Sequence, residues 1–462
     1  MNKSISLFIS VIISLSALSQ NVVITGKAAN QVNKLVRVIV YSDQFSMFEH
    51  TIAQTRTNNM GEFTMKLDVE KTQFAYLAFE LDKGEFYLSP GGKYNFTINN
   101  DTTIVSGSIF DRLPLNFTLN ADDGGIVQTI GDFNMDYNDF VYNNITSIYK
   151  SRDKSTVMKF ITDMKEKYTK NNLEYVNNYV EYSLVSLLWL SRKENNNQIL
   201  ENYIINKPVL YYNIQYTAFF KDFFKNYFAS EKLYTNSELV YAINNPDNKV
   251  LSYLLLRYEQ TTDDERVSEI VKMLLLSRNY YNRDVIKEEV ITKLNNIVSN
   301  SSYSKNRLIA ANFISVLKEM QSGSHAPKFT LVDSNMDTIS LDNFNGKFVL
   351  LSFVKDNCKI CNFHMQLLSD IKKQNQGAFE IVTIVAGSNL KDVINLKKEN
   401  GFDWPILKLD ENILLLEDYN IVAYPSYIFV NPDGTIAYAH LPMPDENMEL
   451  YLQRFMDQYN KQ

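Results

Sequence analysis

Cysteine is scarce in this chain, because its 462 residues include only two, Cys358 and Cys361. One pair cannot staple a chain of this length, so we expect a fold that depends on apolar cores and not on a disulfide framework. No third or fourth cysteine is present to complete a cysteine-rich zinc site. The two cysteines therefore indicate chemistry more than structural reinforcement.

Other absences exclude whole classes of protein. No stretch after the N-terminus approaches the ~20 consecutive apolar residues that a membrane-spanning helix needs. The formal net charge is −7, and this acidic excess argues against nucleic acid as the main partner. The sequence has no serine-triad signature, phosphate-binding loop or metalloprotease motif. We expect no metal and no cofactor.

Residues 1–19 have the pattern of a cleaved signal peptide. A positive charge at Lys3 precedes an uncharged, mostly apolar run, Ser4–Leu18, and Ala17 and Ser19 have the spacing that signal peptidase prefers. No cysteine follows this run, so we do not expect a lipid anchor. The sequence predicts an exported protein of the periplasm or cell envelope, with no transmembrane segment after signal cleavage.

Three regions with different hydrophobic patterns follow. Residues 20–105 alternate apolar and polar residues between turn signals, as in Leu35–Tyr41, which predicts an antiparallel β-sandwich-like domain. Residues 106–320 carry apolar residues at three- and four-residue steps, which predicts an α-helical middle domain. Residues 325–462 alternate strand-like and helix-like segments, which predicts an α/β domain. The chain is therefore expected to be multidomain.

The helical pattern is clearest in Tyr175–Leu190, Pro208–Phe228, Glu238–Tyr258, Asp264–Leu276 and Arg307–Met320. Tyrosine and phenylalanine are dense within the second of these stretches, from Tyr211 to Phe228. These aromatic residues could form a binding surface. Their helical spacing favours packing between helices instead.

The cysteine pair stands directly after an apolar, strand-like run, Lys347–Val354, and at the start of a helical pattern. Asp356 or Asn357 is placed to cap that helix. Cys358 then lies in the first turn, where free backbone N–H groups and the helix dipole stabilise a thiolate. Cys361 lies one turn further, on the apolar face. This arrangement assigns Cys358 as the attacking sulfur and Cys361 as the resolving sulfur.

Far along the chain, Pro425 immediately precedes the strand-like segment Tyr427–Val430. Proline is disfavoured within a strand, but a proline just before one can take the cis form and turn the backbone. Further landmarks follow in order around the cysteine pair and this proline: Ala326–Leu331, Ser340–Lys347, Trp404–Ile406, Asp418–Val422 and Tyr424–Gly434.

With these landmarks, residues 325–462 resemble the thioredoxin superfamily, and most closely its exported TlpA/ResA-like thiol-disulfide oxidoreductases. The resemblance implies a thioredoxin-like fold with a redox-active disulfide between Cys358 and Cys361. It also implies that Pro425 is a cis-proline beside that disulfide and that Tyr424 contacts a partner polypeptide.

The site departs from its relatives at positions that tune reactivity. Ser352 replaces the buried acid of thioredoxins, Asn357 replaces a usual tryptophan, and His364 stands where the TlpA/ResA group usually carries glutamate. We hypothesise that His364 handles the proton of the Cys361 sulfur, which suits an imidazole with an ordinary pKa of about 6.5. The alternative is a half-exposed helix histidine with no role. A zinc site of Cys358, Cys361 and His364 is weaker, because no fourth ligand is clear.

The N-terminal region, at Glu85–Tyr94, loosely resembles the small β-domains that precede TlpA-like domains in exported proteins of Bacteroidetes-type bacteria. The sequence therefore predicts an exported thiol-disulfide oxidoreductase, and the resemblance favours a disulfide reductase. Its expected partners are cysteine-containing envelope proteins and a thiol electron donor. One alternative is an envelope binding or scaffold protein with an accessory thioredoxin-like domain. Another is a redox sensor whose disulfide state alters how the helical region docks.

Overall fold

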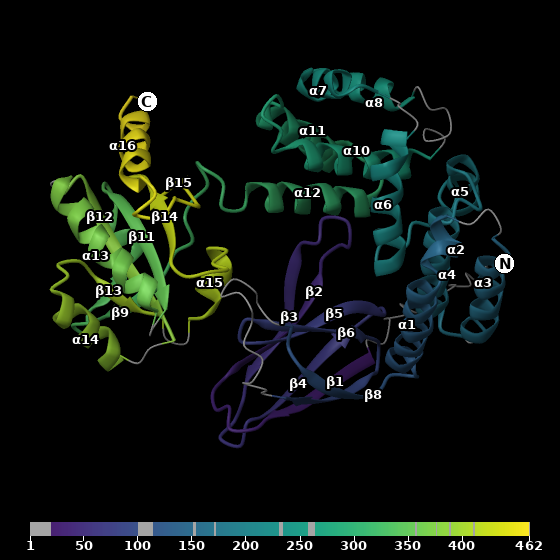
Figure 1. The fold of residues 1–462 in the computed structure, drawn as a ribbon, viewed down its shortest axis with the longest axis horizontal. Coiled ribbons are helices and arrows are strands. Elements are labelled where there is room, and N and C mark those ends of the chain that lie inside the picture. Colours follow the sequence, from purple (N-terminus) through teal and green to yellow (C-terminus); the bar gives the residue numbers. More distant parts are fainter. Residues whose placement is uncertain are drawn as a thin grey trace, which may run out of the picture.

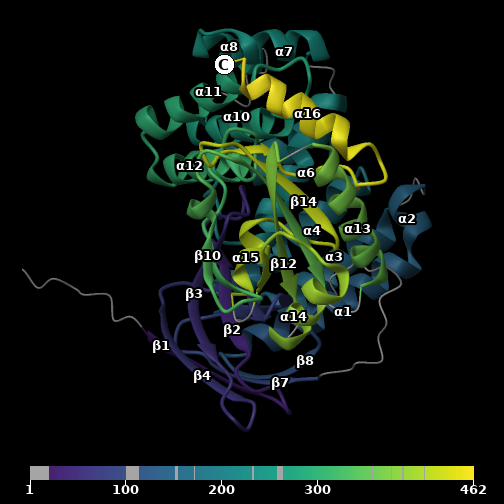
Figure 2. The same ribbon diagram turned by 90° about the vertical axis from the view of Figure 1, so that its left-hand side faces the viewer.

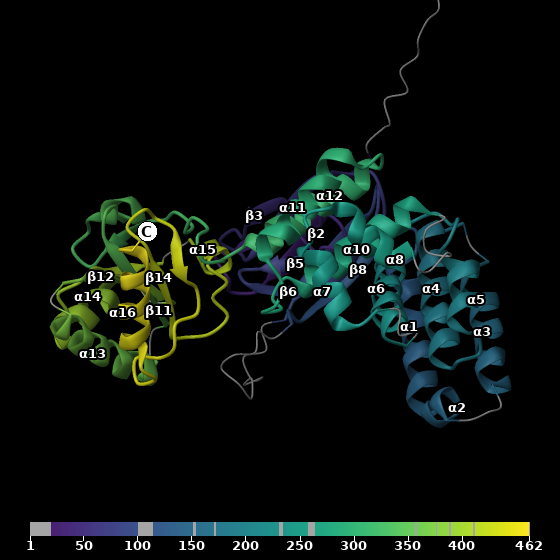
Figure 3. The same cartoon turned by 90° about the horizontal axis from the view of Figure 1, so that it is seen from above.

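The protein folds into three parts that follow the chain, as Figure 1 shows. The computed structural model describes residues 20–99, 114–150, 154–170, 172–230, 234–256, 264–355, 358–375, 377–387, 390–409 and 412–461. The predicted signal peptide lies outside these stretches, as do the two predicted capping residues, Asp356 and Asn357. Seen from above, the C-terminal domain lies at one end and the first helices at the other (Figure 3).

The β-domain (residues 20–99 and 114–122) consists of two four-stranded sheets, with strand orders β4-β1-β7-β8 and β3-β2-β5-β6. The strands are β1 Gln20–Ala28, β2 Leu35–Tyr41, β3 Glu49–Arg56, β4 Glu62–Val69, β5 Gln73–Phe79, β6 Asp82–Leu88, β7 Lys93–Ile98 and β8 Phe117–Asp122. Alternate side chains of both sheets, such as Tyr94 and Phe96 of β7, fill one shared core. The predicted sandwich is confirmed, with one departure: β1 pairs with β7 in parallel.

Strand β8 extends the first sheet beyond residue 105, where we predicted the β-domain to end. It pairs antiparallel with β7, from Phe117 opposite Ile98 to Asp122 opposite Lys93. Its side chains alternate only between half-buried and exposed, so its sequence lacks a clear apolar alternation. The first helix consequently begins at Ile126, whereas the pattern predicted helices from residue 106.

The helical region (residues 126–318) packs around one large apolar core. Its helices are α1 Ile126–Asn143, α2 Ile145–Tyr149, α3 Ser155–Tyr168, α4 Glu174–Leu190, α5 Asn196–Tyr203, α6 Ile214–Ser230, α7 Asn236–Asn244, α8 Asn248–Leu256, α10 Glu265–Asn279, α11 Lys287–Asn300 and α12 Ser304–Lys318. The predicted helix Glu238–Tyr258 is wrong as a single element. Pro246 lies between α7 and α8, and proline lacks the N–H that a continuing helix needs. In the described part of the chain, no helix combines the length and apolarity required to cross a bilayer.

The dense aromatic stretch lies mainly in α6 and belongs to this core, as predicted. Phe220 and Phe223 are fully buried, and Phe224 is 1% exposed. Phe45, from the loop between β2 and β3, packs edge-on against Phe220 with ring centroids 5.4 Å apart. This aromatic contact ties the β-domain to the helical region.

The C-terminal domain (residues 322–461) is built on a seven-stranded sheet of order β10-β9-β13-β12-β11-β14-β15. Its elements are β9 Thr330–Asp333, β10 Thr338–Ser340, the 3₁₀ helix η1 Leu341–Phe344, β11 Phe348–Lys355, α13 Lys359–Gln374, β12 Phe379–Ala386, α14 Leu390–Asn400, β13 Ile406–Lys408, α15 Leu414–Asp418, β14 Ser426–Val430, β15 Ile436–Tyr438 and α16 Met448–Tyr459. Helices α13 and α16 share one apolar core with one face of the sheet, and α15 packs on the other face. Figure 2 views the molecule from the side of this domain.

Strand β11 lies inside the sheet and positions the cysteine pair. Every residue from Phe348 to Val354 is buried, which confirms the central strand predicted from the apolar run. It pairs in parallel with β12 and antiparallel with β14. The carboxyl end of β11, which leads toward the cysteine pair, is therefore held between two neighbouring strands.

Candidate active site

Cys358 and Cys361 form a disulfide at the start of α13. The S–S distance is 2.03 Å and the Cα atoms are 5.2 Å apart. Cys358 occupies the N-cap position, where its sulfur accepts a hydrogen bond from the backbone N–H of Cys361 at 3.2 Å. We expected Asp356 or Asn357 to cap this helix, but the cap residue is Cys358 itself.

The two sulfurs occupy different environments. Cys361 is fully buried in the core under α13, whereas Cys358 is partly exposed. An incoming sulfur can therefore reach Cys358 more readily than Cys361. The N-terminal end of a helix also favours negative charge, so this position stabilises a Cys358 thiolate once the disulfide is reduced.

The predicted proline lies at the same end of the sheet. The peptide bond between Tyr424 and Pro425 is cis, as the sequence predicted. Ser426, the next residue, pairs with Phe353 of β11, so Pro425 lies beside the point where β11 leads toward Cys358. Tyr424 is half-buried against the cores on both faces of the sheet. The sheet register thus brings Tyr424 and Pro425 to the edge that carries the cysteine pair.

Three buried polar side chains gather on the sheet face that α13 covers. Ser352 of β11 lies directly opposite Tyr427 of β14, and both side chains are buried. His364, one turn after Cys361 on α13, is 3% exposed, and its ring centroid is 6.3 Å from that of Tyr427. Neither hydroxyl and neither imidazole nitrogen makes a hydrogen bond within the described residues. These polar groups lie inside the apolar core that α13 and the sheet share.

His364 faces one carboxylate at the protein surface. Its Nε2 atom is 3.4 Å from Oδ1 of Asp445, in the segment that precedes α16. Burial lowers the pKa of His364 below its ordinary value, and the nearby carboxylates Asp445 and Glu446 raise it in part. The net direction is downward, so the imidazole is mainly neutral at neutral pH and can accept a proton. The structure places His364 in the core, which contradicts the alternative of a half-exposed helix residue.

Sequence reasoning missed three exposed apolar side chains, here called the apolar rim, on the segments that carry the cysteine pair and Pro425. Ile360 and Phe363, on the outer face of α13, are 42% and 48% exposed, and Val422 in the loop before Pro425 is 55% exposed. The spacing of three residues between Ile360 and Phe363 was the available signal. Asp445 and Tyr427 were also missed, because nothing in their local sequence indicates proximity to the pair.

The arrangement of the side chains at this site gives little support for metal binding. Among the residues that the structure describes, no three His, Cys, Asp or Glu side chains are grouped so that they could hold a metal ion. Both cysteine sulfurs are bonded to each other. The arrangement is instead suited to thiol–disulfide exchange, since one sulfur is accessible and the other is sheltered.

Comparison with known sequences agrees with this chemistry. Residues 322–439 match the AhpC/TSA family. The thiol-disulfide oxidoreductase ResA of Bacillus subtilis is 31% identical over 121 residues, which are 26% of this chain and 66% of that protein. ResA of Bacillus cereus is 26% identical over 125 residues, which are 27% of this chain and 72% of that protein. The chain thus spans 66% of the length of the first of these relatives.

Solved structures also match part of the chain. The thioredoxin domain of a thiol-disulfide oxidoreductase from Bacteroides vulgatus is 27% identical, and the match covers 29% of this chain and 98% of that domain with a TM-score of 0.28. A thiol:disulfide interchange protein from Bacteroides sp. is 26% identical, and the match covers 30% of this chain and 92% of that protein with a TM-score of 0.27.

Proposed function

We propose that the protein reduces disulfides in cysteine-containing proteins of the cell envelope. The proposal starts from the C-terminal domain, which is thioredoxin-like and similar to thiol-disulfide oxidoreductases. The observation that carries the proposal is the Cys358–Cys361 disulfide, which has one accessible and one buried sulfur at a helix start. The envelope location is part of the proposal and is supported by the signal-peptide pattern of residues 1–19.

The exchange proceeds in two steps from the reduced pair. The Cys358 thiolate attacks one sulfur of a substrate disulfide, which forms a mixed disulfide and releases the other substrate sulfur as a thiolate. Cys361 then loses its proton and attacks the Cys358 sulfur, which releases the second substrate thiolate. Two electrons have moved from the pair to the substrate, and the Cys358–Cys361 disulfide is restored. A thiol electron donor reduces the pair again.

The second step needs a base for the Cys361 thiol, because Cys361 is buried and cannot pass its proton directly to solvent. His364 is one helical turn away, and its imidazole is kept mainly neutral by burial. In this proposal the imidazole accepts the Cys361 proton and Asp445 stabilises the resulting imidazolium. Tyr424, Pro425 and the apolar rim receive the substrate polypeptide beside Cys358.

Trapping of mixed disulfides between Cys358 and its substrates tests the proposal directly. Cys361→Ala removes the resolving sulfur, so we expect Cys358 to remain bonded to its substrates in envelope extracts. Non-reducing electrophoresis and mass spectrometry would then identify the captured proteins. Cys358→Ala is the matched control, since the remaining sulfur is buried and should capture far less.

The same experiment can also refute the proposed function. The proposal is wrong if Cys361→Ala captures no more protein than Cys358→Ala and if the wild-type pair neither reduces nor oxidises a model disulfide such as insulin. Fractionation of cells would overturn the envelope location if the mature chain is found inside the cytoplasm.

A further inference from the structure

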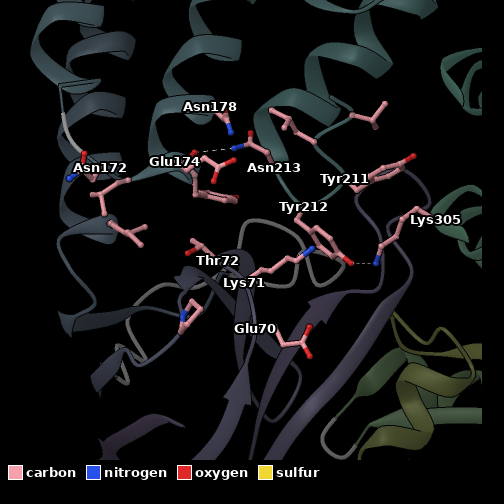
Figure 4. Close-up of a pocket in the computed structure, with 16 residues that line it drawn as sticks. Glu70, Lys71, Thr72, Asn172, Glu174, Asn178, Tyr211, Tyr212, Asn213 and Lys305 are labelled. Carbon is pink, nitrogen blue, oxygen red and sulfur yellow. Dashed lines mark hydrogen bonds between the residues drawn. The ribbon is translucent and has the colours of Figure 1, made fainter. Parts of the chain in front are cut away.

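A cleft of about 640 Å³ lies between the β-domain and the helical region, and none of the residues around the cysteine pair lines it. Its volume falls within the range of roughly 300–1,000 Å³ that is usual for small-molecule sites. Four segments that are far apart in the sequence form most of its walls: residues 70–72 between β4 and β5, residues 172–178 at the start of α4, residues 209–213 before α6, and Lys305 at the start of α12 (Figure 4).

Two lysines meet around one tyrosine at one end of the cleft. The Lys71 and Lys305 ammonium groups are 4.9 and 4.8 Å from the centre of the Tyr212 ring, and Lys305 also donates a hydrogen bond to the Tyr212 hydroxyl. Within the described residues, neither lysine has a carboxylate at ion-pair distance. Glu70, which also lines the cleft, pairs with neither of them. Two lysines that form no ion pair with any described residue and lie near one ring attract an anionic group to this end of the cleft.

Four further polar side chains of the lining have no hydrogen-bond partner among the residues that the structure describes. Thr72, Asn172, Glu174 and Asn178 line the cleft, and their side chains make no hydrogen bond within the described part of the chain. Hydroxyl and amide groups both donate and accept, while Glu174 only accepts. An apolar ligand would leave these groups unpaired, which is costly. The lining therefore favours a ligand rich in hydroxyl groups.

The aromatic walls are held in place by hydrogen bonds to the surrounding structure. The Tyr211 hydroxyl donates to Oδ1 of Asn306 at 3.0 Å. The Asn213 amide donates to the Tyr175 carbonyl at 3.1 Å, the contact drawn as a dashed line at the top of Figure 4. The Tyr211 ring is thus fixed in the wall, and the partly buried rings of Tyr175 and Tyr211 add apolar surface beside the polar groups.

From these features we propose that the cleft binds a sugar acid, that is, a small saccharide that carries a carboxylate. In this proposal the carboxylate lies near Lys71 and Lys305 at the Tyr212 end of the cleft, the sugar ring packs against the tyrosines, and the hydroxyls bond to Asn172, Asn178 and Glu174. This binding is independent of the proposed redox function, because no residue of the cysteine pair contributes to it.

Calorimetric titration of the full chain with digalacturonate at low salt tests the proposal. We expect measurable binding that weakens at higher salt. Lys71→Met and Lys305→Met should each weaken it roughly tenfold or more, since each removes one of the two charges that hold the carboxylate. Lys159→Met, at an exposed position of α3, is the matched control and should bind like the wild type. Lys71 is exposed on a turn, so Lys71→Met keeps the test valid if Lys305→Met fails to fold.

Three comparison ligands separate the possible outcomes. Maltose has the hydroxyls without the charge, succinate has the charge without the hydroxyls, and the dipeptide Glu-Glu has the charge on a peptide. The proposal predicts that each binds at least about tenfold more weakly than digalacturonate, a difference of roughly 1.4 kcal/mol. It is overturned if any of the three binds equally well, or if digalacturonate shows no binding. Reduction of a model disulfide should be the same for all three lysine variants.

Discussion

At the scale of single residues, the two cysteines of the pair differ in their access to a proton acceptor. The N-terminal end of α13 favours a Cys358 thiolate, but it gives no route for a proton from the buried Cys361. By the resemblance to the thioredoxin superfamily, Ser352 and His364 occupy positions where carboxylates are usual. In the mechanism that we propose, the mainly neutral imidazole of His364 in the same core acts as the base. Under this proposal, His364 would gain a positive charge when it takes the Cys361 proton, whereas a carboxylate would lose its negative charge.

Replacing His364 should slow the resolving step. We expect His364→Gln to lower the rate of model-disulfide reduction by about 10²-fold, the effect typical of losing a positioned general base. Glutamine keeps the size and polarity of the side chain but cannot accept the proton. His364→Glu restores an acid that the TlpA/ResA group usually carries and should recover much of the rate. Equal rates and equal Cys361 thiol titrations for wild type and His364→Gln would exclude this role.

His364 should also make the C-terminal domain less stable in mild acid. Burial holds the folded-state pKa below the unfolded value of about 6.5, so between the two values the unfolded chain binds more protons. This contribution is fully present above pH 6.5 and is lost as the pH falls through the folded-state pKa, at a slope of at most about 1.4 kcal/mol per pH unit. As the pH is lowered from 7.5 to 5, denaturant midpoints should therefore fall more steeply for wild type than for His364→Gln. Parallel pH profiles would contradict the expectation.

At the scale of elements, the loop between β2 and β3 anchors the β-domain in the helical core. Phe45 is 3% exposed and its ring lies against Phe220. Asp43 holds the loop in shape, because its carboxylate accepts hydrogen bonds from the backbone N–H groups of Phe45 and Ser46 and from the Asn312 amide of α12. One loop therefore connects a sheet with two helices that are distant in the sequence.

Truncating this anchor should loosen the β-domain from the helices. Phe45→Ala removes a buried ring and should cost about 3–5 kcal/mol of unfolding free energy. Phe363→Ala removes a ring that is 48% exposed and should change stability by about 0.5 kcal/mol or less. Chemical denaturation, followed by hydrogen exchange of the β-domain and the helical region, measures both effects. A similar loss for the two variants would show that Phe45 is not an anchor.

Local patterns predicted those elements whose own residues carry the information. The apolar run of β11, the cysteine pair and Pro425 are contiguous signals, and the C-terminal domain followed from them. Strand β8 was missed, because it alternates only between half-buried and exposed side chains. The contact of His364 with Asp445 depends on the packing of α13 against the segment before α16. No local pattern in the sequence encodes such a contact.

At the scale of the whole molecule, one ion pair joins the β-domain to the C-terminal domain. Both terminal nitrogens of Arg37 in β2 donate to the carboxylate of Glu417 in α15, at 2.7 and 2.8 Å. One of these nitrogens also donates to the Glu80 carbonyl at 3.1 Å. Helix α15 immediately precedes the loop that contains Pro425. The pair therefore fixes the β-domain against the element that leads into the candidate active site.

The two halves of this pair should respond unequally to mutation. The Arg37 side chain is 4% exposed, whereas that of Glu417 is 22% exposed. Glu417→Gln leaves a buried guanidinium without its counter-charge and should cost about 3–5 kcal/mol. Arg37→Met replaces the buried charge with an apolar chain and leaves Glu417 able to reach water, so its cost should be clearly smaller. Limited proteolysis between the two domains and denaturant midpoints would measure the difference.

Glu380→Gln is the control, because it breaks a more exposed ion pair with Lys347 and should cost at most about 1 kcal/mol. A larger loss for Arg37→Met than for Glu417→Gln would show that the desolvated guanidinium does not control this interface.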